Sequence, residues 1–122
     1  MRPKEIDRQV GTLLPLKPVV LQVLLSLADG ERHGYGIVQD ILQRSAARMR
    51  LEPGNLYRSL KSMLEAGLIE ESERRPASDL DDERRRYYRI TRLGRRVAAA
   101  EADRLQVLAA EAHALLKSAG RA

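Results

Sequence analysis

EPGNLYRSLKSMLEAGLIE, residues 52–70, is the stretch of this chain that decides its fold. Pro53 suits the first position of a helix, because its fixed φ angle and missing N–H cost nothing there. Gly67 suits the left-handed residue just past a helix end. Apolar residues recur between them at helical spacing and therefore share one face: Leu56, Leu60, Met63 and Leu64. The segment predicts an amphipathic helix that runs directly into a strand.

The opposite face of this helix carries amide, hydroxyl and cationic side chains: Asn55, Arg58, Lys61 and Ser62. A helix that buries one side and offers such groups on the other can lie in the major groove of DNA. An ordinary surface helix would look the same, because Lys and Arg commonly lie on solvated faces. Tyr57 lies at the border of the apolar face. Its ring can pack there while its hydroxyl reaches a phosphate, and a half-buried core tyrosine is the alternative.

Composition limits the class of protein. The 122 residues include four tyrosines but no Phe, Trp or Cys, and they carry a formal charge of +5. The length is that of one domain, and the aliphatic composition is typical of a mostly helical protein. The lack of cysteine excludes disulfides and cysteine-ligated metal sites and fits a reducing cytoplasm. The basic charge modestly favours a polyanionic partner.

Targeting and membrane segments are not expected. The first residues lack the apolar stretch of a secretory signal. The most hydrophobic run, residues 13–28, is too short and too interrupted by proline and lysine to span a membrane. We therefore expect a cytoplasmic protein.

The rest of the chain predicts two helices before residues 52–70, a hairpin that includes the end of that stretch, and one long final helix. The first helix is expected over residues 18–28. The second follows a turn at 33–36 and runs to about residue 48. The strands are expected over 68–74 and 85–90, and the last helix runs from 92 to about 118. In the second helix, Arg44 is expected to face away from the core. The two strands would be marginally stable alone and need the helices to pack against.

The last helix has a recognisable start and an apolar seam. Thr91 is a good N-cap, and the following residues are rich in Ala, Leu and Glu without proline. We define the apolar seam by its residues: Leu105, Leu108, Ala112, Leu115 and Leu116. The chain itself offers little to cover this seam, so pairing with a second copy is the simplest solution.

The order α-α-α-β-β-α matches a winged helix, which is a helix-turn-helix with a hairpin wing. The predicted fold class is mainly α with a small β-hairpin, followed by one long C-terminal helix. We expect residues 1–15 to be an N-terminal arm, mobile or helical, residues 16–90 to be a winged-helix DNA-binding domain, and residues 91–122 to be a dimerisation helix.

Three blocks of sequence, in this order and spacing, resemble the PadR family of bacterial transcriptional regulators: LLSLADGERHGYGIVQDI (24–41), LEPGNLYRSLKSMLEAGLIE (51–70) and RRRYYRITRLGRR (84–96). The length is similar to that of the smaller subfamily, which has a single C-terminal helix. The resemblance implies a homodimer that binds a roughly palindromic operator, usually as a repressor. It also implies that a small molecule or stress signal releases the protein, as in many members.

The resemblance assigns roles to the elements. It implies that the third helix enters the major groove, that the wing flanks it and that the last helix dimerises. Pro53, Gly54, Leu56 and Tyr57 fit the block that opens the family's recognition helix. Asn55 stands where many members carry a small hydroxyl residue, and it can hydrogen-bond a phosphate or an adenine edge.

The candidate DNA-binding residues come from three places in the chain. They are Tyr35, then Asn55, Tyr57, Arg58, Lys61 and Ser62, and finally the basic cluster Arg84, Arg85, Arg86 and Arg89. Tyr35 can instead be a packing residue that positions the helix-turn-helix. Acidic residues precede the basic cluster and would repel phosphates: Asp79, Asp81, Asp82 and Glu83. We expect the tip of the wing to point away from DNA or to fold over the arginines.

Catalysis and metal binding find no support. The chain has no Gly-rich phosphate loop and no Ser/His/Asp set, and Glu70 and Glu71 read as surface charges on opposite faces of a strand. His33 suits a capping or solvated role, and His113 is too distant to complete a metal site. We expect no enzyme activity, metal or cofactor. The rival class is a winged-helix protein-interaction module that does not bind DNA. An effector pocket at the last helix would be aliphatic, because that helix has no aromatic residue.

Overall fold

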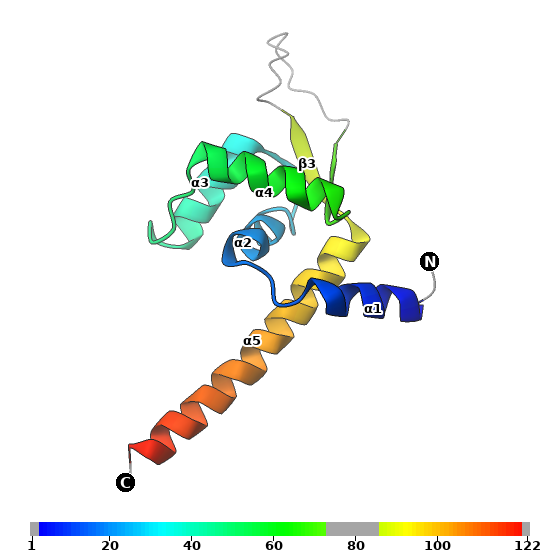
Figure 1. Ribbon diagram of the computed structural model, residues 1–122. Coiled ribbons are helices and arrows are strands. Elements are labelled where there is room, and N and C mark those ends of the chain that lie inside the picture. Colours follow the sequence, from blue (N-terminus) through cyan, green and yellow to red (C-terminus); the bar gives the residue numbers. More distant parts are fainter. Residues whose placement is uncertain (1–2, 73–85, 121–122) are drawn as a thin grey trace.

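A computed structural model of the chain describes residues 3–72 and 86–120. Its elements are α1 (Pro3–Leu13), α2 (Pro18–Ser26), β1 (Arg32–His33), α3 (Gly34–Arg44), α4 (Pro53–Glu65), β2 (Ile69–Glu71), β3 (Tyr87–Ile90) and α5 (Arg92–Ala119). Figure 1 shows a small domain from which α5 protrudes. The predicted fold class is confirmed: the protein is mainly helical, with a small antiparallel sheet and a long last helix.

The sheet differs from the predicted two-stranded hairpin, because it has three strands in the order β1-β3-β2. Arg32 pairs with Tyr88 and His33 with Tyr87. The expected turn at residues 33–36 is therefore the end of a short strand followed at once by α3. This extra strand gives β3 a hydrogen-bonding partner along its second edge.

β2 and β3 are shorter than the strands predicted over residues 68–74 and 85–90. The structure begins β2 at Ile69, and residues 73–85, which include the acidic residues of the wing, lie outside the described residues. Along β3, Tyr88 is buried and Arg89 is exposed, in keeping with the alternating faces of a strand.

α4 has the predicted bounds. It begins at Pro53, and the chain leaves it through Gly67, whose φ of 76° places it in the left-handed region. The Leu68 N–H donates to the Met63 carbonyl (3.0 Å) and the Gly67 N–H donates to the Leu64 carbonyl (3.1 Å). These two bonds form a Schellman motif, which ends the helix and turns the chain directly into β2.

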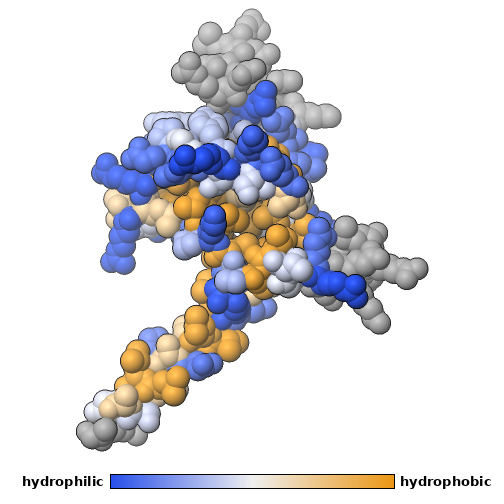
Figure 2. Space-filling view, in the orientation of Figure 1, coloured by the Kyte–Doolittle hydropathy of each residue, from blue (hydrophilic) through white to orange (hydrophobic). Residues whose placement is uncertain are grey.

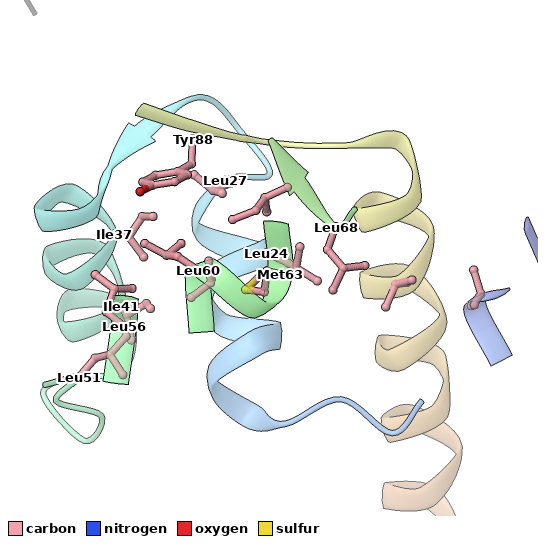
Figure 3. Packing of buried hydrophobic residues seen from close by; sticks show 14 residues of the cluster. Leu24, Leu27, Ile37, Ile41, Leu51, Leu56, Leu60, Met63, Leu68 and Tyr88 are labelled. Carbon is pink, nitrogen blue, oxygen red and sulfur yellow. The ribbon is translucent and has the colours of Figure 1, made fainter. Parts of the chain in front are cut away.

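The core is aliphatic, as the composition predicts, with one tyrosine at its edge. Figure 3 shows side chains of α2, α3 and α4 converging beneath β3. The cluster of buried side chains includes Leu24, Leu27, Ile37, Ile41, Leu56, Leu60, Met63, Ile69, Tyr88 and Val97. Each fully buried side chain of this size contributes about 1.5–3 kcal/mol to stability. The apolar face of α4 is thereby held on α2 and α3.

α3 ends at Arg44, about four residues before its predicted end near Arg48. Ala46 and Ala47 have φ angles of 52° and 64°, and left-handed backbone cannot continue a right-handed helix. The Ala47 N–H donates to the Leu42 carbonyl (2.8 Å), which ties the turn to the end of the helix. Alanine is a strong helix former, so composition alone concealed this stop.

Arg44 is exposed, as predicted for a residue that faces away from the core, and it also joins α3 to α2. Its guanidinium donates to Asp40 Oδ2 (2.8 Å), Gln22 Oε1 (2.9 Å) and Ser26 Oγ (2.9 Å). The Ser26 hydroxyl also donates to Asp40 Oδ2 (2.7 Å). Burial acts to raise the pKa of Asp40, but the hydrogen bonds from Ser26 and Arg44 and the charges of Arg44 and Arg32 lower it overall. This network fixes the angle between the two helices.

α1 confirms the helical alternative for the N-terminal arm and packs against α5. Glu101 of α5 holds the link between α1 and α2, because its buried carboxylate accepts from the Leu16 N–H (3.1 Å) and from Arg104 Nη2 (3.0 Å). The hydrogen bond from Arg104 lowers the pKa of Glu101, burial opposes this change, and the Leu16 N–H adds to it.

The start of α5 packs against Leu68, the residue before β2, and against Ile90 of β3. Thr91 caps the helix as predicted, since its hydroxyl oxygen accepts from the Gly94 N–H (3.0 Å). Gly94 is buried, and a Cβ atom at this position would lie 2.1 Å from the Leu68 carbonyl oxygen and 2.9 Å from Ile90 Cγ1. Only glycine permits this approach of helix to strand.

Candidate nucleic-acid interface

The outer face of α4 is polar and exposed, as its sequence predicts. Asn55, Arg58, Lys61 and Ser62 are all exposed, while Leu56, Leu60 and Met63 on the opposite face are buried. Figure 2 shows this hydrophilic surface over α4. The Arg58 guanidinium donates to Asn55 Oδ1, so the two side chains present their remaining donors together. Lys61 has no ion-pair partner within residues 3–72 and 86–120. The face can therefore donate several hydrogen bonds to an anionic or base-edge acceptor.

Tyr57 lies at the border between the buried and exposed faces, as predicted. Its side chain is 44% exposed. Its hydroxyl oxygen lies beside Gly34, where an added Cβ would be 3.4 Å away. The ring thus packs on the first turn of α3 while part of it stays accessible, which is compatible with both readings of this residue.

Tyr35 is 67% exposed at the start of α3, so it is not a core residue. Its ring stacks on His33 with 6.3 Å between centroids, and His33 meets the edge of Tyr87 at 5.4 Å. His33 Nδ1 accepts from the Gly36 N–H (3.0 Å), which confirms the predicted capping role. His33 thus caps α3, contacts Tyr87 of the sheet and stacks on the ring of Tyr35.

Two arginines of the basic cluster are paired with carboxylates of the neighbouring strand. Arg86 Nη1 lies 3.0 Å from Glu71 Oε1, and Arg89 Nε lies 2.7 Å from Glu70 Oε1. Glu31 adds a second carboxylate 4.0 Å from Arg89. Strand register brings Glu70 directly opposite Arg89, a cross-strand pairing that the sequence reading took as separate surface charges. To bind a phosphate, these arginines must either bridge it and their carboxylate partners or leave those carboxylates.

Arg84 and Arg85, the other half of the cluster, lie outside the described residues, as do the acidic residues before them. The structure therefore places Tyr57 of α4 against Gly34 of α3, the residue before Tyr35, and it places Arg89 on β3 with Arg86 just before that strand. Sequence reasoning missed Asp40 and Glu101, although the (i, i+4) pair of Asp40 with Arg44 and the (i, i+3) pair of Glu101 with Arg104 were readable signals.

The apolar seam on α5 is largely uncovered. Leu105, Leu108, Leu115 and Leu116 are 39%, 50%, 63% and 71% exposed, and Val107, which the prediction omitted, is 66% exposed. Figure 2 shows this apolar surface along the protruding end of α5. Residues 105–119 extend about 20 Å at the standard helical rise, beyond the part of α5 that packs on α1 and α2.

Within the described ranges, no group of three or more His, Cys, Asp or Glu side chains is placed to hold a metal ion. No helix among these same residues has the length and apolar character needed to cross a membrane. A shallow hollow lies on α5 between charged and aliphatic side chains, without an aromatic lining: Ala100, Asp103, Arg104, Val107, Leu108 and Glu111.

Known structures share this arrangement. A PadR family transcriptional regulator from Eggerthella lenta is 25% identical, covers 93% of this chain and 88% of its own, and has a TM-score of 0.65. A PadR family regulator from Clostridium difficile is 20% identical, with coverage of 82% and 99% and a TM-score of 0.68. A transcriptional regulator from Clostridium thermocellum is 19% identical, with coverage of 93% and 95% and a TM-score of 0.65.

A search of curated proteins finds no match. The profile of the transcriptional regulator PadR-like family matches residues 23–100, which span α2 from Val23, α3, α4, the sheet and the first third of α5. The matched region thus contains both the exposed face of α4 and the sheet beside it. The chain belongs to the PadR-like family of transcriptional regulators.

Proposed function

We propose that this protein is a sequence-specific DNA-binding regulator that acts in the cytoplasm as a homodimer, as a repressor on a roughly palindromic operator. The observation that carries the proposal is the outer face of α4. It presents amide, guanidinium and ammonium groups to solvent, while Leu56, Leu60 and Met63 fix the same helix on the core. Members of the family are typically not enzymes, and no catalytic step is proposed.

The side chains divide by the chemistry they offer. Arg58 and Asn55 suit base edges, because Arg donates in bidentate fashion to guanine and Asn pairs with adenine. Lys61, Ser62 and Tyr57 suit phosphate oxygens, which position the helix without reading sequence. The hydrogen bond between Arg58 and Asn55 supports a joint role, since the free atoms of both groups then face the groove together.

Tyr35 and the basic cluster extend the proposed surface beyond α4. Tyr35 would contact a phosphate through its exposed hydroxyl. Arg84, Arg85, Arg86 and Arg89 would add affinity that does not depend on sequence, by releasing counterions from DNA. For Arg86 and Arg89 this contribution is reduced by the carboxylates that already neutralise them.

Dimerisation follows from the apolar seam. Pairing of two copies of α5 would cover side chains that water now surrounds, and a two-fold axis there would present two α4 helices to successive major grooves. In this proposal residues 16–90 bind DNA, residues 91–122 dimerise and α1, within residues 1–15, braces α5. An effector that releases the protein would bind an aliphatic site at α5. A thermal-shift screen of a compound library tests this part, and a wholly silent screen counts against it.

The experiment that tests the proposed function is in-vitro selection of bound duplexes from a random library, followed by salt titration of the selected duplex. The proposal predicts a dimer by sedimentation and a selected sequence with two-fold symmetry, bound with an affinity that falls steeply as salt rises. A monomer that selects no sequence and shows no salt-sensitive binding would instead favour a winged-helix module that docks another protein.

A further inference from the structure

The connection between α3 and α4 carries two arginines whose side chains have no partner among the described residues. Most arginines that the structure describes already donate to an oxygen of another residue: Arg32, Arg44, Arg58, Arg86, Arg89, Arg95 and Arg104. Arg48 and Arg50 are exposed, and their side chains form no hydrogen bond or ion pair with any residue in the ranges 3–72 and 86–120. Positive charge that is not neutralised therefore gathers just before α4.

Both arginines lie at the surface of the connection between α3 and α4. Met49 packs against the core and Leu51 is only 8% exposed, whereas Arg48 and Arg50 between and before them are exposed. Because Met49 and Leu51 pack inward, the exposed side chains of Arg48 and Arg50 both lie at the surface of this connection. The Met49 N–H also donates to Ser45 Oγ (3.0 Å), which anchors the segment to the end of α3.

The position of this segment complements that of the sheet. β2 follows the C-terminal end of α4 through Gly67, while the segment with Arg48 and Arg50 precedes its N-terminal end (Figure 1). α4 has 13 residues, or about 20 Å, whereas the major groove is about 12 Å wide. Segments that flank the two ends of a helix in the groove therefore lie near the phosphates that border it.

We propose that Arg48 and Arg50 form a phosphate-binding site on DNA beside the N-terminal end of α4. This inference rests on the proposed function, and it adds two residues outside the candidates found from the sequence. At the other end of α4, Arg86 and Arg89 are paired with Glu71 and Glu70. Arg48 and Arg50 therefore contribute more affinity for the DNA backbone than these two arginines do.

The test is a salt titration of the full chain on the selected duplex, by fluorescence anisotropy, with the double variant Arg48→Ala/Arg50→Ala. Loss of two phosphate contacts in each protomer makes the negative slope of log K against log salt less steep, by about 1.8 for each protomer bound. Affinity at 150 mM salt falls about 10-fold or more, while the selected sequence stays the same. Arg48→Lys/Arg50→Lys keeps both charges and restores most of the slope.

A matched control removes the same charge elsewhere. Arg8 of α1 and Lys17 before α2 are exposed, so Arg8→Ala/Lys17→Ala changes the net charge equally and leaves the DNA slope unchanged. Equal slopes for the parent chain and Arg48→Ala/Arg50→Ala, or equal losses in the two double variants, overturn the inference. A parent chain that binds no duplex overturns the proposed function itself, which is a different result.

Discussion

Gly94→Ala probes the contact that joins α5 to the sheet. The new methyl group would lie 2.1 Å from the Leu68 carbonyl oxygen, which also accepts from the Thr91 N–H (3.1 Å). Relief of such a contact requires the helix and the strand to separate by more than 1 Å, because ordinary carbon–oxygen contacts are about 3.4 Å or longer. The strained atom is backbone, so a side-chain rotation cannot remove the clash.

Two opposing effects set the change in the free energy of unfolding. Overpacking in a rigid contact costs about 1–3 kcal/mol, and replacing glycine by alanine in a helix returns about 0.5–1 kcal/mol. Gly94→Ala is therefore expected to lower the free energy of unfolding by about 1–2 kcal/mol. Gly54 occupies the first turn of α4 with no atom within 4 Å of an added Cβ, so Gly54→Ala should raise it by up to about 1 kcal/mol.

The assay is urea unfolding followed by circular dichroism, with all chains at one protein concentration because association stabilises the folded state. The expected order of midpoints is Gly54→Ala, then the parent chain, then Gly94→Ala. If Gly94→Ala unfolds at or above the midpoint of the parent chain, the reasoning about the packing of α5 on Leu68 and Ile90 is refuted.

Three further predictions concern the turn, the buried network and the seam. Ala46→Gly and Ala47→Gly should each stabilise the chain by up to about 1 kcal/mol in the same assay, because left-handed backbone costs alanine about 1–2 kcal/mol; a lower midpoint in both would contradict the observed turn. Asp40 has a pKa below its ordinary value of 3.8, so it contributes stability above that pH which is lost as pH falls through its folded pKa. The difference in free energy of unfolding between the parent chain and Asp40→Asn should therefore shrink in acid. A difference that does not change with pH would contradict the stabilising role of the ionised Asp40. Leu108→Glu/Leu115→Glu should yield a folded monomer by analytical ultracentrifugation, and a persistent dimer would exclude the seam as the interface.

α4 was predictable because its signals are local. Pro53 and Gly67 mark the two ends, and the apolar residues between them repeat at helical spacing, so no distant contact was needed. The polar face followed from the same spacing. Tyr57 was also placed correctly, since its position on the wheel fixes it at the border of the buried face.

The errors arose where distant parts of the chain decide the structure. β1 has two residues and no periodicity, and only its pairing with β3 makes it a strand. Alanines at 46 and 47 favour a helix locally, yet the chain must turn there to bring α4 onto the core. Pairing of Arg89 with Glu70 depends on strand register, which the sequence does not state. The buried Glu101 likewise depends on where the link before α2 crosses α5.

The claim that the outer face of α4 reads DNA is tested most directly by the affinity of Arg58→Ala for the selected duplex. The Arg58 side chain is exposed and hydrogen-bonds only to Asn55 among the described residues, so its removal should leave folding and dimerisation intact. Loss of one base contact costs about 1–3 kcal/mol, and binding should weaken about 5- to 150-fold for each protomer, with relaxed preference at the contacted base pair. Unchanged affinity and unchanged base preference in an anisotropy titration would contradict the account.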